Sequence, residues 1–159
     1  MRNRFFVCQV NETLCVRCGM CEEIIICPGP RQCIGCLACF QGCPYEAREL
    51  VADEGPRGTI HITLDGAALE VPERITLKRA LEMAGLTFGI GPGEGELQAP
   101  CRTGGCYGCL VEADGEVVRA CVSPVREGMV VRTTLPEGYE PRRIVHGPQP
   151  HSVGGKATP

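Results

Sequence analysis

The stretch CVRCGMCEEIIICP, residues 15–28, decides the fold of the first half of the chain. Its pattern, three cysteines separated by two residues each and a later Cys-Pro, recurs 18 residues further on as CIGCLACFQGCP, residues 33–44. Three thiolates at this spacing can surround one centre, because a tight turn points its side chains inward and its N–H groups toward the sulfur atoms. A fourth cysteine must close each site. The repeat therefore predicts two metal centres made from Cys15, Cys18, Cys21, Cys27, Cys33, Cys36, Cys39 and Cys43.

The composition favours metal binding over other classes of function. The chain has 159 residues, 13 cysteines and only 4% aromatic residues, so a large core built on aromatic rings is not expected and bound metal is expected to support folding. An odd number of cysteines cannot all form disulfides, and neither a signal peptide nor a membrane span is recognisable. We therefore expect a cytoplasmic protein with reduced thiols. A net charge of -3 gives no basic footprint for nucleic acid.

A second group of cysteines follows after 57 cysteine-free residues, in the segment PCRTGGCYGCLV, residues 100–111. Three thiolates in one loop and a distant fourth are typical of a [2Fe-2S] cluster, and the four predicted ligands are Cys101, Cys106, Cys109 and Cys121. The glycines of this loop lack a Cβ, so the backbone can pass close to a cluster and turn its N–H groups toward sulfide. These predicted cofactor-binding glycines are Gly104, Gly105 and Gly108.

The residues around the second group predict a small sheet with one helix. Two Asp-Gly pairs between apolar runs predict hairpin turns, and Thr76 is placed to cap a helix that Gly85 ends. The predicted strands are residues 59–64, 67–71, 109–113, 116–120 and 129–133. Two strands, a helix, a loop and further strands follow one another in the order of a β-grasp fold.

The first half, about residues 4–51, resembles the bacterial-type ferredoxins with two [4Fe-4S] clusters. In that family the cysteine before proline binds the cluster of the other repeat, so the resemblance implies one cluster on Cys15, Cys18, Cys21 and Cys43 and another on Cys27, Cys33, Cys36 and Cys39. Five residues instead of the usual three precede Cys27, and the connection between the repeats is short. Structural zinc sites or a disulfide knot are the alternatives. The apolar run FFVCQV, residues 5–10, predicts a strand, and Cys8 is interpreted as a small buried hydrophobic residue in it rather than a ligand.

The second half, about residues 58–134, resembles the β-grasp [2Fe-2S] ferredoxins. Its gap of 11 residues before Cys121 is similar to that of the iron–sulfur subunits of succinate dehydrogenase and fumarate reductase. In those subunits the [2Fe-2S] domain comes first, whereas here it comes second. The resemblance to these subunits is therefore taken to imply only the four cysteine ligands of this chain, and not the subunits' partners or quinone chemistry.

Together these features predict an α+β protein with a small 2[4Fe-4S] ferredoxin-like domain at residues 1–52 and a β-grasp [2Fe-2S] ferredoxin-like domain at residues 53–135. A proline-rich extended tail or linker is expected at residues 136–159. The resemblances imply single-electron transfer between a low-potential donor and a partner redox enzyme. The partner is expected to present a basic surface, because the clusters with their thiolates add negative charge. No catalytic residues are predicted.

An alternative hypothesis comes from the tail and from residues 33–48. The tail reads like a linker before a catalytic domain, and CIGCLAC with the following CPYEAR resembles ferredoxin inserts of radical SAM activating enzymes. On that hypothesis the chain feeds electrons to a radical SAM centre located elsewhere, because the further Cys-x3-Cys-x2-Cys motif is not in this sequence. A zinc-stapled interaction module is a third possibility.

Overall fold

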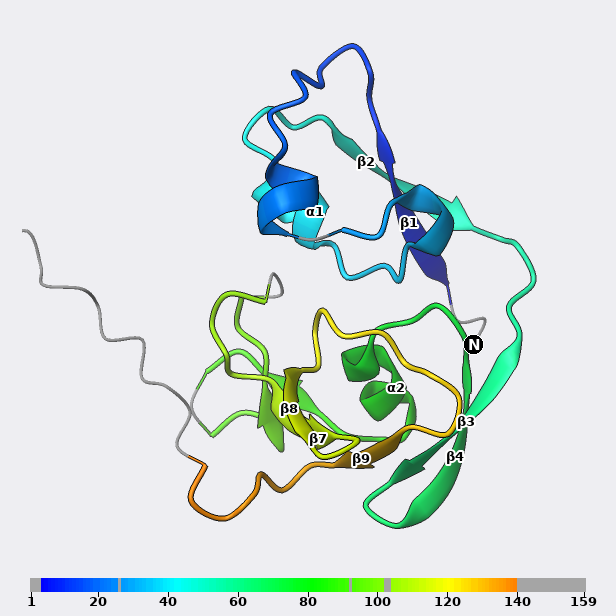
Figure 1. Cartoon of the computed structure of the whole chain (residues 1–159), viewed down its shortest axis with the longest axis vertical. Helices are drawn as coiled ribbons and strands as arrows, with labels where there is room; N and C mark the ends of the chain where they lie inside the picture. The colour runs from blue at the N-terminus through cyan, green and yellow to red at the C-terminus, as the bar shows by residue number, and fades with distance from the viewer. Residues whose placement is uncertain (1–3, 26, 92, 102–103, 140–159) are drawn as a thin grey trace, which may run out of the picture.

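The computed structural model describes residues 4–25, 27–91, 93–101 and 104–139, which form two modules joined by a short connection (Figure 1). The first module contains the duplicated cysteine motif, and the second contains the larger sheet. Residues 140–159 of the predicted tail lie outside the described residues. Within the described part of the chain, no helix is long and apolar enough to cross a membrane.

The first module is framed by one antiparallel strand pair. β1 (Phe5–Val10) pairs along its whole length with β2 (Arg48–Asp53), and Cys8 lies opposite Leu50. The cysteine repeats lie between these strands and form short turns only: a π-helical turn (Met20–Ile24), a 3₁₀ turn (Pro30–Gln32) and α1 (Ala38–Gly42). The strand at β1 was predicted from its apolar run, whereas β2 was not.

The second module has the elements that the sequence predicts, with ends that differ by at most one residue. They are β3 (Thr59–Leu64), β4 (Ala67–Pro72), α2 (Leu77–Met83), β7 (Leu110–Ala113), β8 (Glu116–Arg119) and β9 (Val130–Arg132). The sheet order is β4-β3-β9-β7-β8, with β3 and β9 parallel and the other neighbours antiparallel. This is the predicted β-grasp arrangement and is compatible with a [2Fe-2S] ferredoxin-like domain.

Local chemistry explains where these elements turn and begin. Asp65 and Gly66 both have positive φ, 47° and 86°, and Asp114 and Gly115 repeat this with 52° and 85°. Positive φ at both central residues defines the type I′ turn that matches the twist of a hairpin. The Thr76 side chain accepts a hydrogen bond of 3.1 Å from the Arg79 amide, which caps α2 as predicted.

The hydrophobic core lies almost entirely in the second module. Leu77, Ala80 and Leu81 of α2 are fully buried, and they belong to one cluster with Val111 and Val131 of the sheet. The second cluster of buried residues among those described is much smaller and consists of Cys8, Cys33 and Cys39 in the first module. Burial of apolar surface therefore stabilises the two modules unequally.

A minor parallel pair, β5 (Phe88–Gly89) and β6 (Leu97–Gln98), leads into the second cysteine loop. The Ala99 amide donates a hydrogen bond of 3.0 Å to the Gly89 carbonyl oxygen, just before Pro100. This pair anchors the beginning of the cysteine loop to the segment that follows α2.

Candidate iron–sulfur centres

In the second module, the β7–β8 hairpin brings together two predicted ligands. Cys109 directly precedes β7 and Cys121 follows β8 by two residues, so the antiparallel pairing places them side by side. The Cys121 amide donates a hydrogen bond of 3.4 Å to Cys109 Sγ. Both side chains are buried, with exposed fractions of 1% for Cys109 and 4% for Cys121.

The other two predicted ligands of this module lie in the loop that precedes the hairpin. The Cys106 amide donates a hydrogen bond of 3.2 Å to Cys101 Sγ, and the Gly108 amide donates one of 3.4 Å to Cys106 Sγ. Amide donors around sulfur stabilise thiolates, the form that binds iron. The loop therefore offers the donor chemistry that an iron–sulfur cluster requires, namely thiols with N–H groups directed at their sulfur atoms.

The thiols of this site change one another's pKa through hydrogen bonds and charge. Hydrogen bonding from Cys121 lowers the pKa of Cys109 to about 6. Hydrogen bonding to Cys109, burial, and the negative charges of Cys109 and Cys101 raise the pKa of Cys121. The hydrogen bond between the two thiols therefore favours the thiolate at Cys109 and the protonated thiol at Cys121, and the charge of Cys101 acts on both. A metal centre would take the place of that proton.

Two of the three predicted glycines have a clear steric reason. Gly104 has a φ of 80°, and a Cβ there would lie 3.0 Å from the methyl groups of Val122. A Cβ on Gly108 would lie 3.2 Å from Pro100 Cδ and 3.5 Å from Cys106 Sγ. Gly105 is exposed. The positive φ and the close contact therefore favour glycine at position 104, and the packing of the loop on its own protein leaves little room for a side chain at position 108.

Arg119 is a further residue of this site that the sequence analysis missed. Its guanidinium donates a hydrogen bond of 2.6 Å to the Gly104 carbonyl oxygen and lies 5.2 Å from the centre of the Tyr107 ring. Tyr107 itself has a φ of 56°, an uncommon conformation for a residue with a side chain. Arg119 thus fastens the cysteine loop to β8. Nothing in the local sequence distinguishes this arginine from others.

In the first module, one cavity is lined by four of the eight predicted [4Fe-4S] ligands. It has a volume of about 380 Å³, and its lining includes Cys15, Cys18, Cys21 and Cys43. These are the three cysteines of the first repeat and the last cysteine of the second. The Ala47 amide donates a hydrogen bond of 3.4 Å to Cys43 Sγ, so an amide donor is directed at one of these thiols too.

The remaining four predicted ligands influence one another directly. Burial raises the pKa of Cys36 and of Cys27, and the charges of Cys39 and Cys33 raise both further, while backbone amides lower them. Cys27 packs against the buried cluster that contains Cys33 and Cys39, and hydrogen bonding with Cys27 contributes to lowering the pKa of Cys39. The last cysteine of the first repeat therefore lies beside the triplet of the second.

Cys8 is a fifth thiol at this second group. Its side chain is buried, as predicted, and it clusters with Cys33 and Cys39. Its amide lies 3.5 Å from Cys33 Sγ and donates a hydrogen bond to it. Hydrogen bonding from the Cys8 thiol lowers the pKa of Cys33 to about 5 and that of Cys39 to about 6. Cys8 thus acts as a donor to the predicted ligands, a role that its position in a strand did not reveal.

Arg48 lies at both groups of thiols. It lines the cavity of the first group, where its guanidinium hydrogen-bonds to Cys21, and the charges of Cys39 and Cys27 of the second group also act on it. Burial lowers the pKa of Arg48, but the hydrogen bond and the neighbouring thiolates raise it above its ordinary value. A cation whose charge acts on two anionic sites stabilises the negative charge at both.

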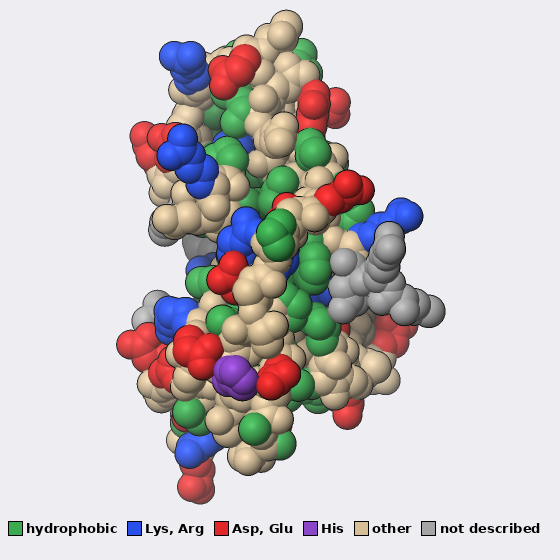
Figure 2. Space-filling view, turned by 90° about the vertical axis from the view of Figure 1, so that its right-hand side faces the viewer, with side chains coloured by type: hydrophobic (Ala, Val, Ile, Leu, Met, Phe, Trp, Pro, Cys, Tyr) green, Lys and Arg blue, Asp and Glu red, His purple; other side chains and the backbone are tan. Residues whose placement is uncertain are grey.

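Other candidate side chains do not form a site in the described structure. His61 on β3 is exposed between two carboxylates, 3.2 Å from Glu70 and 3.4 Å from Glu127 (Figure 2). Among the residues that the structure describes, no three His, Cys, Asp or Glu side chains are grouped around a single metal ion position.

The fold of the second module and its loop of cysteines define an iron–sulfur protein. Comparison with known families places residues 57–136 in the 2Fe-2S iron-sulfur cluster binding domain family. The chain belongs to this family. A domain of this kind binds a [2Fe-2S] cluster and indicates electron transfer in general terms. The match covers the second module and does not include the duplicated motif of the first.

Proposed function

We propose that this chain is an electron carrier with three iron–sulfur clusters, which passes single electrons between a low-potential donor and a partner redox enzyme. One [2Fe-2S] cluster is held by Cys101, Cys106, Cys109 and Cys121. One [4Fe-4S] cluster is held by Cys15, Cys18, Cys21 and Cys43, and another by Cys27, Cys33, Cys36 and Cys39. When bound, each cluster supplies a centre that accepts and releases one electron.

The observation that carries this proposal is the composition of the cavity in the first module. Three cysteines of one repeat and the final cysteine of the other line the same space. The crossed pattern is typical of two-cluster ferredoxins, in which each Cys-Pro cysteine binds the cluster of the opposite repeat. Two zinc sites have no such need, since zinc is usually bound by paired Cys-x2-Cys segments.

The chain's own residues have three tasks in this function. The thiolates bind iron, the amides of Cys106, Gly108 and Ala47 donate to ligand sulfurs, and the two strand-framed modules hold the cysteine loops in place. No proton transfer or bond formation at a substrate is part of the proposal, so no catalytic residue is assigned. The partner surface is proposed to be basic, because bound clusters add negative charge to a chain whose net charge is already -3.

Metal analysis of anaerobically prepared protein tests the proposal. We expect about ten irons and ten acid-labile sulfides per chain, in two [4Fe-4S] clusters and one [2Fe-2S] cluster. About eight irons without a [2Fe-2S] spectrum would remove the cluster of the second module from the proposal. A colourless protein that holds zinc and no sulfide would overturn the electron-transfer function and leave the interaction module as the explanation.

Supply of electrons to a radical SAM centre remains the alternative candidate. It rests on the linker-like tail and on the resemblance of residues 33–48, and none of the described contacts favours it over electron transfer to another redox enzyme. The two candidates share the same clusters and differ only in the acceptor.

A further inference from the structure

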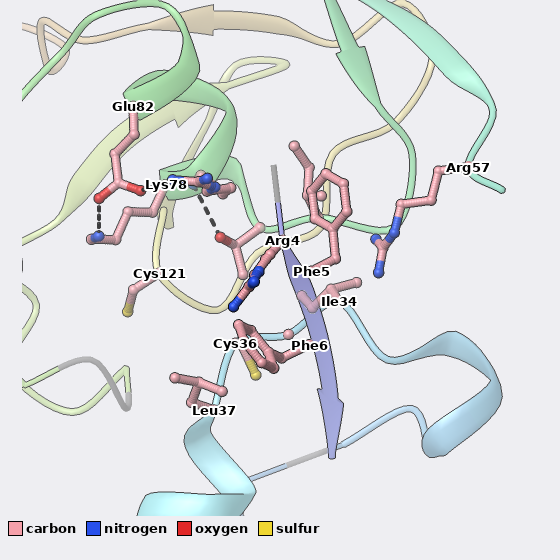
Figure 3. A pocket seen from close by; sticks show the side chains of 14 residues that line it. Arg4, Phe5, Phe6, Ile34, Cys36, Leu37, Arg57, Lys78, Glu82 and Cys121 are labelled. Carbon is pink, nitrogen blue, oxygen red and sulfur yellow. Dashed lines mark hydrogen bonds and ion pairs between the residues drawn. The ribbon is translucent and has the colours of Figure 1, made fainter. Parts of the chain in front are cut away.

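Two predicted ligands from different modules line the same cleft. The cleft has a volume of about 210 Å³, and its lining includes Cys36 of the first module and Cys121 of the second. Figure 3 shows both cysteines at this cleft, together with Leu37 beside Cys36 and the α2 residues Lys78 and Glu82. Cys36 belongs to one proposed [4Fe-4S] site and Cys121 to the [2Fe-2S] site. This cleft is therefore where the sites of the two modules approach each other.

The wall that carries Cys36 is held directly against β1. A Cβ on Gly35, whose φ is 69°, would lie 2.8 Å from the carbonyl oxygen of Phe6. Only glycine allows this approach, so the backbone beside Cys36 lies on the backbone of β1. The position of Cys36 relative to the second module consequently depends on how β1 is fastened to that module.

Arg57, in the connection between β2 and β3, makes this attachment. Its guanidinium lies 4.3 Å from the centre of the Phe5 ring on β1 and forms an ion pair of 2.6 Å with Asp53 at the end of β2. The same guanidinium donates hydrogen bonds to the carbonyl oxygens of Glu73 and Arg74 in the second module. The side chain is 5% exposed, so water competes little for these contacts.

The residues of the second module that Arg57 contacts are directly followed in the chain by residues that line the cleft. Arg74 forms a second ion pair with Asp53, at 3.7 Å, and is followed by Ile75 and Thr76, which line the cleft. The Arg57 Nε is buried with no hydrogen-bond partner among the described residues, so the other contacts of the guanidinium have to offset the loss of its hydration. Through its contacts this one buried side chain connects β1, the end of β2 and residues 73–74 of the second module.

We infer that Arg57 is a latch between the modules, which holds the Cys36 and Cys121 sites on one cleft so that these two centres exchange electrons. The inference rests on the proposed function and deepens it, because it gives the order of the centres. In the exchange one electron leaves a reduced centre and enters an oxidised one, and no bond or proton is transferred.

The order of the three cluster sites follows from the residues that line the first-module cavity and the cleft between the modules. The cavity of Cys15, Cys18, Cys21 and Cys43 is lined only by residues between Val10 and Arg48, all in the first module. The cleft of Cys36, in contrast, is shared with the second module. The site of the first group is thus the outer one, the site with Cys36 is intermediate, and the [2Fe-2S] site comes last.

Paramagnetic resonance of the reduced holoprotein tests this order. A reduced [4Fe-4S] centre relaxes fast, so it should accelerate the electron spin relaxation of a neighbouring reduced [2Fe-2S] centre. We expect this acceleration in the wild-type protein and its loss in Arg57→Leu, with the iron and sulfide contents unchanged. Arg126→Leu is the matched control, because Arg126 is exposed and pairs only with Asp114, at 3.6 Å, among the contacts found for it. It should behave like the wild type.

The possible outcomes separate the inference from the function on which it rests. Missing clusters in the wild type would overturn the proposed function. A full set of clusters with no magnetic interaction in the wild type would overturn the proposed order and leave the function intact. Acceleration that persists in Arg57→Leu would show that Arg57 is no latch. If Arg57→Leu loses iron, Arg57→Lys keeps the charge without the fork of donors, and wild-type relaxation in that variant would count against the latch.

Discussion

The Nη1 of Arg119, at the end of β8, donates a hydrogen bond of 2.6 Å to the carbonyl oxygen of Gly104 in the cysteine loop. The same side chain lies over the ring of Tyr107, 5.2 Å from its centre. One arginine therefore holds the loop on both sides of Cys106. The described residues of this loop form no helix or strand, so such side-chain contacts and the amide–sulfur hydrogen bonds support its shape.

Replacing Arg119 with leucine should make the [2Fe-2S] site labile without affecting the first module. The variant loses a hydrogen bond from a charged donor, which contributes about 1.5–3 kcal/mol, and the contact with the ring. Chelator should then bleach the [2Fe-2S] absorbance several times faster than in the wild type. Arg132→Leu removes an exposed arginine of β9 that lies 3.5 Å from Glu112, and should bleach at the wild-type rate. Equal rates in both variants would contradict the role of Arg119.

The sequence predicts the second module well because its signals are local. Asp65-Gly66 and Asp114-Gly115 fix two hairpins, and Thr76 fixes the start of α2, each within a few residues of the chain. β2 gives no such signal. Four of its six residues are exposed, so the alternation of apolar and polar residues that marks a half-buried strand is missing. Its partner β1 lies about 40 residues away in the sequence.

In the candidate sites, too, the features that could be predicted are local in the sequence and the others depend on distant contacts. Cysteine spacing predicts the grouping of thiols, since three ligands of each site lie within one turn or loop. The residues that support them, Arg57, Arg119 and Cys8, act through contacts with segments that are 15 or more residues away. Their roles depend on tertiary packing, and a single arginine or cysteine in the sequence carries no sign of it.

The crossed ligand sets predict which cluster each cysteine variant loses. Cys43→Ala should damage the cluster of Cys15, Cys18 and Cys21, whereas Cys27→Ala should damage the cluster of Cys33, Cys36 and Cys39. Paramagnetic resonance of the two reduced variants, compared with the wild type, distinguishes the two spectra. If each variant instead lost the cluster of its own repeat, the crossed assignment would be wrong.

Removing the Cys8 thiol should lower the reduction potential of the [4Fe-4S] site beside it. Hydrogen bonding to Cys33 and Cys39 raises the pKa of Cys8, so this thiol stays protonated and acts as a donor. Donors to cluster ligands stabilise the more negative, reduced state. We expect Cys8→Ala to shift one potential downward by some tens of millivolts at full iron content, and Cys8→Ser, which keeps a donor, to shift it less. Loss of that cluster from Cys8→Ala would identify Cys8 as a ligand instead.

Arg48→Gln should lower the potentials of both [4Fe-4S] sites. The guanidinium hydrogen-bonds to Cys21 and its charge acts on Cys39 and Cys27, so it favours the addition of an electron to either site. A charge interaction of about 1.4 kcal/mol corresponds to about 60 mV for one electron. A redox titration followed by paramagnetic resonance measures the shift. Arg31→Gln, at an exposed arginine of the 3₁₀ turn, is the control, and an equal shift in both variants would mean that only overall charge matters.

Removal of the clusters should unfold the first module before the second. The described buried cluster of the first module consists of three cysteines, Cys8, Cys33 and Cys39, so metal binding supplies most of its folding free energy. The second module keeps the packing of α2 against the sheet, around Leu77 and Val111, when iron is lost. After treatment with chelator or oxygen, limited proteolysis should therefore cleave within residues 4–51 first and spare residues 58–134 for longer. Simultaneous digestion of both modules, or a metal-free first module that stays protected, would contradict this difference in stability.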